Sequence, residues 1–291
     1  MIAGGERAPE VAIIGLGVIG GSAALRLYER GTSFAAYTTG EQDRLLAAAA
    51  GVPVAADLEL AVRHAGVVFV AVPLDALARV AEEVVRVAPG TATLLHASSL
   101  QRQESLHLSA DVWSRFVGTH PLAGSHRSGF AAASPEMFRR ATVFVERRAS
   151  ARQRADAELF WSLAGASRIE YATADAHDRA MSWASHLPQL AATALAAALA
   201  GTLGSDERAA TADIPIGPGA RDATRLAMSS LEIWEPILAR APESTVAALR
   251  ALEDRLAGLR VGLERGDWEL VRAEWDRARQ WRLAAEEASR A

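Results

Sequence analysis

The strongest constraint on the fold is a glycine pattern near the N-terminus. Gly15-x-Gly17-x-x-Gly20 directly follows an apolar run at residues 11–14. In such a pattern the first glycine permits a tight turn, the second lets the backbone approach a pyrophosphate, and the third allows close packing of helix on strand. A buried strand that enters a helix through this turn predicts a dinucleotide site, with the phosphates facing the helix N-terminus.

Further apolar runs predict more strands in the first half of the chain. One run is stopped by Pro73, as expected for a parallel strand buried on both faces. Strands that alternate with helical stretches predict an α/β N-terminal Rossmann domain with a doubly wound parallel sheet, residues 1–171. The predicted strands are residues 33–37, 67–72, 93–96, 116–119 and 142–145.

The second half of the chain, residues 172–291, predicts an all-α domain. Alanine and leucine dominate from Ala174 onward, and residues 243–291 predict two amphipathic helices that separate near Gly266. The apolar faces of these helices are too extensive for a monomer of this size to bury. We therefore expect a homodimer that forms through the helical domain.

Composition excludes several function classes. The net charge is −4 and the basic residues are scattered, so no nucleic-acid partner is expected. No apolar run is long enough to span a membrane and no signal segment is evident, so we expect no membrane partner and a cytoplasmic location. The absence of cysteine excludes disulfides, thiolate nucleophiles and Cys-ligated metals, and no metal site is predicted.

The end of the second predicted strand bears on the cofactor. NAD-preferring sites usually place Asp or Glu there, whereas this chain has Thr38 and Thr39, which can donate hydrogen bonds to a 2′-phosphate. Arg44 adds positive charge nearby. These residues favour NADP over NAD; the alternative is that Glu41 reaches the ribose of NAD. The predicted cofactor-binding residues are Gly15, Gly17, Val18, Ile19, Gly20, Thr38, Thr39, Arg44, Val72 and Pro73.

A second motif surrounds His120, at the predicted carboxyl end of a strand, where open α/β sheets bind ligands. Pro121 restricts the backbone of His120 to an extended conformation. The segment Gly118-Thr119-His120-Pro121-Leu122-Ala123-Gly124, with Ser128-Gly129 after it, resembles the signature of prephenate and arogenate dehydrogenases. The resemblance covers nearly the whole chain. It extends to Asp178-Arg179-Ala180-Met181, Ser185-His186-Leu187-Pro188, Arg221-Asp222-Ala223-Thr224-Arg225-Leu226-Ala227 and Trp234.

The resemblance implies an NAD(P)-dependent oxidoreductase of tyrosine biosynthesis. Such enzymes oxidise a cyclohexadienol at C4: hydride goes to the nicotinamide, the opposite carboxylate leaves as carbon dioxide, and prephenate becomes 4-hydroxyphenylpyruvate. His120 would accept the proton of the 4-hydroxyl, with Ser99 hydrogen-bonded to the same groups. Arg225 would bind a substrate carboxylate, unless it forms a surface ion pair with Asp222. The implied substrate-binding residues are Arg225, Gln189, His186, His126 and Trp234.

This chain departs from the family at positions that bear on the substrate. Gln189 stands where the family often has histidine, and His126 where it often has an acid. Before Ser99, His96 occupies the place of a common Asp, and Gln101 that of a common Lys. Losing an acid at position 126 favours the keto acid prephenate over an amino acid, because an ammonium group loses its partner. Arogenate and 4-amino-4-deoxyprephenate remain as alternatives.

Two readings compete with this one. A β-hydroxyacid dehydrogenase or imine reductase has a similar architecture, but the hydroxyacid enzymes need a catalytic lysine and this chain contains none. A non-catalytic dinucleotide-binding sensor would need the glycine turn but neither His120 nor Arg225. Turnover with prephenate separates these readings.

Overall fold

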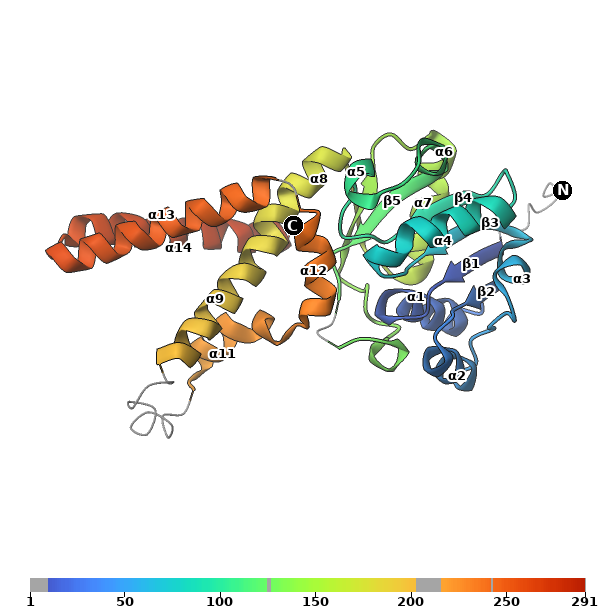
Figure 1. Cartoon of the computed structure of the whole chain (residues 1–291), viewed down its shortest axis with the longest axis horizontal. Coiled ribbons are helices and arrows are strands. Elements are labelled where there is room, and N and C mark those ends of the chain that lie inside the picture. The colour runs from blue at the N-terminus through green and yellow to red at the C-terminus, as the bar shows by residue number, and fades with distance from the viewer. Residues whose placement is uncertain (1–9, 125–126, 203–215, 242, 291) are drawn as a thin grey trace.

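The computed structural model describes residues 10–124, 127–202, 216–241 and 243–290. Its first part is a seven-stranded sheet of order β2-β1-β3-β4-β5-β6-β7 (Figure 1). Neighbouring strands run parallel except β5 and β6, which are antiparallel. The strands are β1 (Glu10–Ile14), β2 (Phe34–Tyr37), β3 (Ala65–Val70), β4 (Thr93–His96), β5 (Phe116–Pro121), β6 (Thr142–Glu146) and β7 (Arg168–Ala172).

Helices cover both faces of this sheet. Side chains of successive strand residues point to opposite faces, so each strand contributes to two cores. Ile13 and Phe69 pack with α1 and α7 on one face, whereas Ile14 and Val68 pack with α3, α4 and α6 on the other. The helices of this part are α1 (Val18–Glu29), α2 (Glu41–Ala49), α3 (Leu58–Val62), α4 (Leu74–Val87), α5 (Gln103–Leu106), α6 (Ala110–Arg115) and α7 (Ala151–Ala164).

The predicted strands and the doubly wound arrangement are confirmed, with two corrections. The sheet is not purely parallel, because β6 pairs antiparallel with β5. The strand β7 was not predicted: its residues are all at least partly exposed and it is not a continuous apolar run. β7 pairs only with β6 and forms the edge of the sheet. An edge strand with one neighbour carries a weaker apolar signal than a central parallel strand.

The remainder of the chain is helical and extends away from the sheet as two arms (Figure 1). α8 passes through a π-helical turn, Ser182–His186, directly into α9, which forms one arm with α11. α13 and α14 pack on each other as the other arm, and α12 contacts α4 of the sheet part. The helices are α8 (Ala174–Met181), α9 (Leu187–Thr202), α11 (Pro218–Thr224), α12 (Leu231–Ala239), α13 (Glu243–Arg265) and α14 (Trp268–Arg290), with a 3-10 turn at Arg225–Met228.

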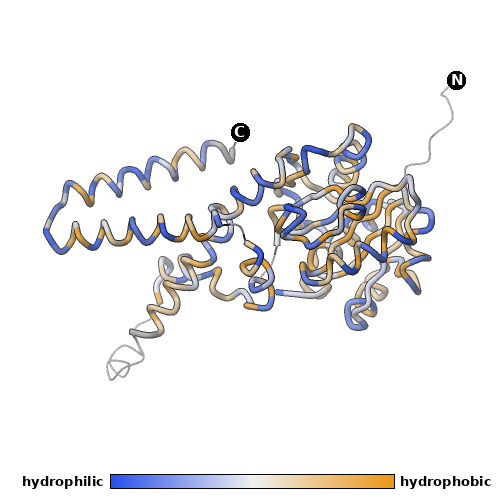
Figure 2. Tube along the Cα trace, turned by 45° about the horizontal axis from the view of Figure 1, so that its top comes forward, coloured by the Kyte–Doolittle hydropathy of each residue, from blue (hydrophilic) through white to orange (hydrophobic). Residues whose placement is uncertain are grey.

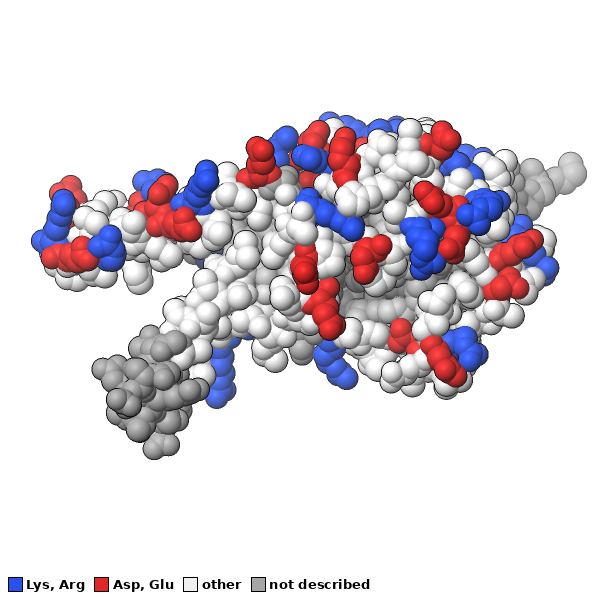
Figure 3. Space-filling model, viewed as in Figure 1, with Lys and Arg blue, Asp and Glu red and all other residues white. Residues whose placement is uncertain are grey.

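The arms leave much apolar surface uncovered. Figure 2 shows hydrophobic residues recurring along both arms, and Figure 3 shows few charges along the α9 arm. α9 carries no charged residue at all. Within the described part of the chain, no helix combines the length and the apolar character that crossing a bilayer requires. The exposed apolar side chains of the arms include Leu195, Leu199, Leu256, Leu263, Trp268, Trp275 and Trp281.

Candidate active site

The glycine turn joins β1 to α1 with almost no free space at two of its glycines. Gly15 has φ +93°, and a Cβ there would lie 2.4 Å from the carbonyl oxygen of Ala71. A Cβ on Gly20 would lie 1.9 Å from the carbonyl oxygen of Gly15. Gly17, by contrast, faces open space and begins α1 without a side-chain cap. The turn therefore leaves free backbone N–H groups where a pyrophosphate would bind.

A cavity of about 320 Å³ lies beside this turn, at the carboxyl ends of β1, β2 and β3. Gly15 and Gly17 line it, while Val18, Ile19 and Gly20 form the first turn of α1. The further predicted residues that line it are Thr38, Thr39, Val72 and Pro73.

Charged residues around this cavity differ from the sequence-based prediction. Arg44 is exposed on α2 and is not among the lining residues. Arg79 of α4 lines the cavity instead and forms an ion pair with Glu83 at 2.8 Å. Asp43 also lines it, but its Oδ1 accepts a 2.7 Å hydrogen bond from the backbone N–H of Phe130. Sequence reasoning missed Arg79, because α4 follows β3 and only the fold brings it to the end of β2.

A second cavity, of about 620 Å³, lies between the sheet and the helical part. His120, at the end of β5, is half-buried and faces it. The predicted residues Ser99, His186, Gln189, Arg225 and Trp234 line the same cavity. His126 lies outside the described residues. The structure thus brings together six side chains from four separate segments of the chain.

Arg225 begins the 3-10 turn after α11 and is exposed at this cavity. Among the described residues no ion pair is found for Arg225, including the one with Asp222 considered above. Its guanidinium is therefore available for a carboxylate ligand, to which it can donate two parallel hydrogen bonds.

Gln189 of α9 is buried, and its Nε2 donates to the carbonyl oxygen of Leu226 at 3.1 Å. Its Oε1 is buried without a hydrogen-bond partner in the described part of the chain. An unsatisfied acceptor at the wall of a cavity costs free energy unless a ligand or water donates to it. Gln189 therefore connects α9 by a hydrogen bond to the turn that carries Arg225, while its Oε1 stays without a donor in the described residues.

His186 and Trp234 form the floor of the cavity on the helical side. The Nδ1 of His186 is hydrogen-bonded to Thr245 Oγ1 at 2.9 Å, and its ring stands at 89° to that of Trp234, with centroids 6.1 Å apart. Burial lowers the pKa of His186, so the ring is neutral near pH 7. With Nδ1 held by Thr245, His186 has a positioning and lining role in this geometry.

Burial also governs His120. It lowers the pKa of His120 to about 3, with smaller contributions from repulsion by His177, His96 and His186. His120 is therefore neutral at physiological pH and offers a ring nitrogen that can accept a proton. Behind it lies His177, whose Nε2 is 2.9 Å from His120 Nδ1. Sequence reasoning missed His177, although it is next to Asp178 in one of the motifs quoted above.

Comparisons with known proteins identify the family. Residues 23–168 match the family model "Prephenate dehydrogenase, nucleotide-binding domain", and residues 173–275 match "Prephenate dehydrogenase, dimerization domain". Cyclohexadienyl dehydrogenase of Zymomonas mobilis is 28% identical over 289 residues, covering 94% of this chain and 95% of that protein.

Solved structures share the fold. Prephenate dehydrogenase of Aquifex aeolicus in complex with hydroxyphenyl propionate and NAD+ superposes with a TM-score of 0.82 at 22% identity, covering 97% of this chain and 100% of that one. Arogenate dehydrogenase of Synechocystis gives a TM-score of 0.78 at 22% identity, with 95% and 99% coverage. The chain belongs to the prephenate dehydrogenase family and is a nicotinamide-dependent oxidoreductase of that class.

Proposed function

We propose that the protein oxidises prephenate to 4-hydroxyphenylpyruvate with release of carbon dioxide. The observation that carries this proposal is the cavity that holds a neutral His120 from the sheet opposite Arg225 from the helical part. The substrate offers a hydroxyl that must lose a proton and carboxylates that need a cation. The names of the relatives, two of which are prephenate and cyclohexadienyl dehydrogenases, support the same substrate class.

A dinucleotide held at the cavity lined by Gly15, Gly17, Thr38 and Thr39 would supply the acceptor for a hydride from C4 of the substrate. His120 accepts the proton of the 4-hydroxyl as that hydride departs, because its ring is neutral and lies at the cavity wall. Loss of carbon dioxide leaves its electron pair in the ring, which becomes aromatic. The proton on His120 returns to the C4 oxygen, so the product is a phenol and the reaction releases no net proton. Ser99, on the same wall, is placed to orient the hydroxyl.

Arg225 binds one substrate carboxylate, since no ion pair competes for it among the described residues. Gln189 serves the substrate side chain: its free Oε1 accepts hydrogen bonds, which suits an ammonium group as well as a bridging water. This acceptor is the specific observation that keeps an amino substrate, arogenate or 4-amino-4-deoxyprephenate, as the second candidate. We propose no structural role for His126.

For the cofactor we propose NADP over NAD. Thr38 and Thr39 line the nucleotide cavity at the end of β2, where an NAD site usually has an acid. Arg79 supports this choice more directly than Arg44, because it lies in the same cavity lining. The opposing charges in this lining are Glu83, which is paired with Arg79, and Asp43, whose Oδ1 accepts from the backbone N–H of Phe130. Arg79→Ala should weaken NADP+ more than NAD+; an equal loss for both would assign Arg79 to the adenine.

We also propose a homodimer that forms through the helical arms. The family's dimerization domain matches this part of the chain, and the arms expose Trp268, Trp275 and Trp281 at 57%, 71% and 70%. Side chains of this size are seldom left exposed together without a partner surface. The domain division we propose, 1–171 and 172–291, falls at the end of β7.

The direct test is steady-state turnover. Prephenate, arogenate and 4-amino-4-deoxyprephenate are each offered with NAD+ and with NADP+, and reduced nicotinamide is followed by absorbance. We expect the highest kcat/KM for prephenate with NADP+. Preference for an amino substrate would move the assignment to the second candidate. Binding of dinucleotide without turnover of any of the three would support the sensor instead.

A further inference from the structure

A buried chain of hydrogen bonds begins behind His120 and runs away from the cavity. His120 Nδ1 lies 2.9 Å from His177 Nε2, and His177 Nδ1 lies 2.8 Å from Asp178 Oδ1. His177 is 2% exposed and Asp178 is fully buried. Both come from α8, in the helical part, whereas His120 is on β5. The chain therefore connects the base at the cavity to a carboxylate that the substrate does not reach.

The hydrogen bonds of Asp178 decide which atoms in this chain carry protons. Its Oδ1 accepts from the backbone N–H of Gln101 at 2.9 Å, and its Oδ2 accepts from that of Arg102 at 3.1 Å. A carboxylate whose two oxygens both accept backbone N–H groups acts as an acceptor only. The partner at His177 Nδ1 must therefore be an N–H donor. A neutral His177 then has its lone pair on Nε2, facing His120.

The hydrogen bond between His177 and His120 fixes the next proton. With His177 in its neutral form, Nε2 can only accept, so the atom 2.9 Å away, His120 Nδ1, carries the hydrogen. The other nitrogen of a neutral His120, Nε2, is then left without a proton. We propose that His177 and Asp178 are positioning residues that hold His120 in the tautomer whose Nε2 can accept the substrate's proton. The inference rests on the proposed function only in making His120 the base.

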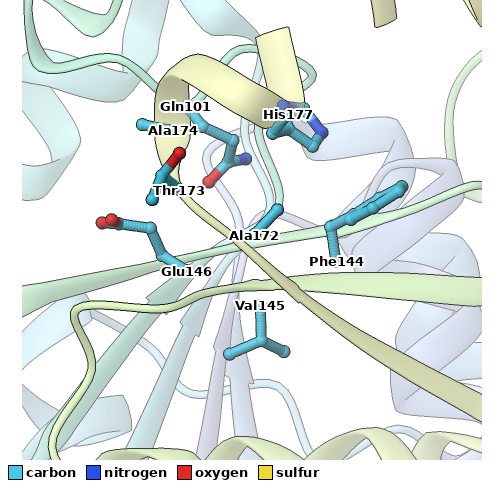
Figure 4. A pocket seen from close by; sticks show the side chains of 8 residues that line it. All are labelled: Gln101, Phe144, Val145, Glu146, Ala172, Thr173, Ala174 and His177. Carbon is cyan, nitrogen blue, oxygen red and sulfur yellow. The ribbon is translucent and has the colours of Figure 1, made fainter. Parts of the chain in front are cut away.

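Contacts with two neighbouring rings fix the orientation of the His177 ring. The ring of Phe144 on β6 stands at 78° to it and that of His120 at 74°, each with centroids 5.1 Å away. Figure 4 shows His177 and Gln101 on one side and Phe144 and Glu146 on the other. These residues line a small cavity of about 10 Å³. Rotation of His177 about its side-chain bonds would break its contacts with both neighbours, so the ring keeps one orientation.

Other titratable groups near the pair do not supply an alternative partner. His96 on β4 and His186 in the π-helical turn interact electrostatically with His120, and Glu146 on β6 lies across the small cavity from His177. His186 Nδ1 is held by Thr245, and Glu146 is paired with Arg148. Arg148 in turn acts on His96. Asp178 is thus the acid that hydrogen-bonds this imidazole pair within the described residues.

The first test reads the tautomer itself and needs no substrate. Protein labelled with 15N in histidine is examined by NMR, and the His120 signals are assigned by their loss in His120→Asn. We expect the His120 proton on Nδ1 and an unprotonated Nε2 at pH 7. A proton on Nε2 would overturn the proposal. Asp178→Ala removes the acceptor of His177 Nδ1–H, so His177 is no longer held in one tautomer and part of the His120 protons should move to Nε2. An unmoved proton would also overturn it.

The second test uses kinetics and a matched pair of variants at position 177. Asp178→Ala should lower kcat on the order of 10³- to 10⁴-fold with little change in KM, because His120 is then no longer held in the tautomer that accepts the proton, while binding is kept. His177→Gln keeps an acceptor for His120 Nδ1–H and should lose about 10-fold, whereas His177→Leu has none and should lose at least about 100-fold. Equal losses in the Gln and Leu variants would assign His177 a merely structural role.

These two tests separate the proposal from the function on which it rests. If prephenate is not turned over, the NMR tautomers still support or overturn the role of His177. If Asp178→Ala does not fold, the His177 pair still decides, provided that both variants bind dinucleotide as the wild type does. Loss of dinucleotide binding in His177→Gln, where the acceptor is kept, would count against the proposal, since it would show that His177 supports the fold.

Discussion

The sheet part and the helical arms solve the problem of burial in different ways. In the sheet part, both faces are covered by helices of the same segment, and nearly all members of the two cores come from residues 11–164. In α13 the buried residues are Thr245, Ala248 and Gly262, while Leu256 and Leu263 are exposed. The sheet part therefore has a core of its own, whereas the arms need a further surface to cover them.

The two parts also contribute different groups to the candidate site. The self-contained part provides the dinucleotide cavity and His120, groups that must be fixed before substrate arrives. The helical part provides Arg225, Gln189 and Trp234, which line the second cavity from the other side. His177 and Asp178 lie at the boundary, since they belong to α8 but hydrogen-bond to β5 and to the backbone after β4. Variants on each side should accordingly fail in different ways.

The largest effect is expected from the sheet side. His120→Asn removes the proton acceptor but keeps a polar side chain, so kcat should fall about 10³-fold while dinucleotide affinity stays unchanged. Steady-state kinetics and a dinucleotide titration measure the two quantities. His64→Asn, at an exposed histidine, is the control and should behave as wild type. Near-normal turnover in His120→Asn would remove this residue from the mechanism.

The helical side should show the opposite kinetic pattern. Arg225→Ala removes a carboxylate partner, so KM for prephenate should rise about 10- to 100-fold with a smaller change in kcat. Arg221→Ala is the control, because Arg221 is exposed on α11 and is not among the residues lining the cavity. An unchanged KM in Arg225→Ala would show that Arg225 does not bind the substrate carboxylate.

The uncovered arms lead to a third expectation. Trp275→Glu places a charge on the apolar face of α14 and should shift the protein from dimer to monomer in sedimentation equilibrium, because large aromatic side chains dominate interface energetics. Gln280→Glu adds the same charge at an exposed polar position of the same helix and should leave the dimer intact. Two variants that sediment alike would show that this face of α14 is not the interface.

The last expectation concerns the stability of the sheet part. Burial lowers the pKa of His96 from 6.5 to about 3, so the unfolded chain takes up a proton there before the folded protein does. His96 therefore contributes to the loss of stability as the pH falls from about 6.5 toward 3, at up to about 1.4 kcal/mol per pH unit.

The check for His96 is denaturant unfolding between pH 7 and pH 4. His96→Asn keeps an acceptor for the backbone N–H of Ser98, with which His96 Nδ1 is hydrogen-bonded at 3.3 Å. The variant should be less stable at pH 7 but should lose stability less steeply on acidification. The same slope in wild type and variant would show that His96 titrates normally in the folded protein.

Local signals explain what could be predicted from the sequence. The glycine turn and the apolar runs act through neighbouring residues, so the central strands and the position of His120 at the end of β5 followed from them, whereas the order of the strands in the sheet did not. The antiparallel pairing of β5 with β6 depends on which edge a distant strand reaches, and no local pattern encodes it. Arg79 at the nucleotide cavity and His177 behind His120 could not be predicted either, because each is far in sequence from the residues that it joins there.

The most direct test of the account is product stoichiometry in a single reaction mixture. Purified protein is incubated with prephenate and NADP+, and reduced nicotinamide, 4-hydroxyphenylpyruvate and carbon dioxide are quantified together. The account predicts equal amounts of all three, and their joint loss in His120→Asn. Dinucleotide binding without reduction, or reduced nicotinamide without carbon dioxide, would contradict it.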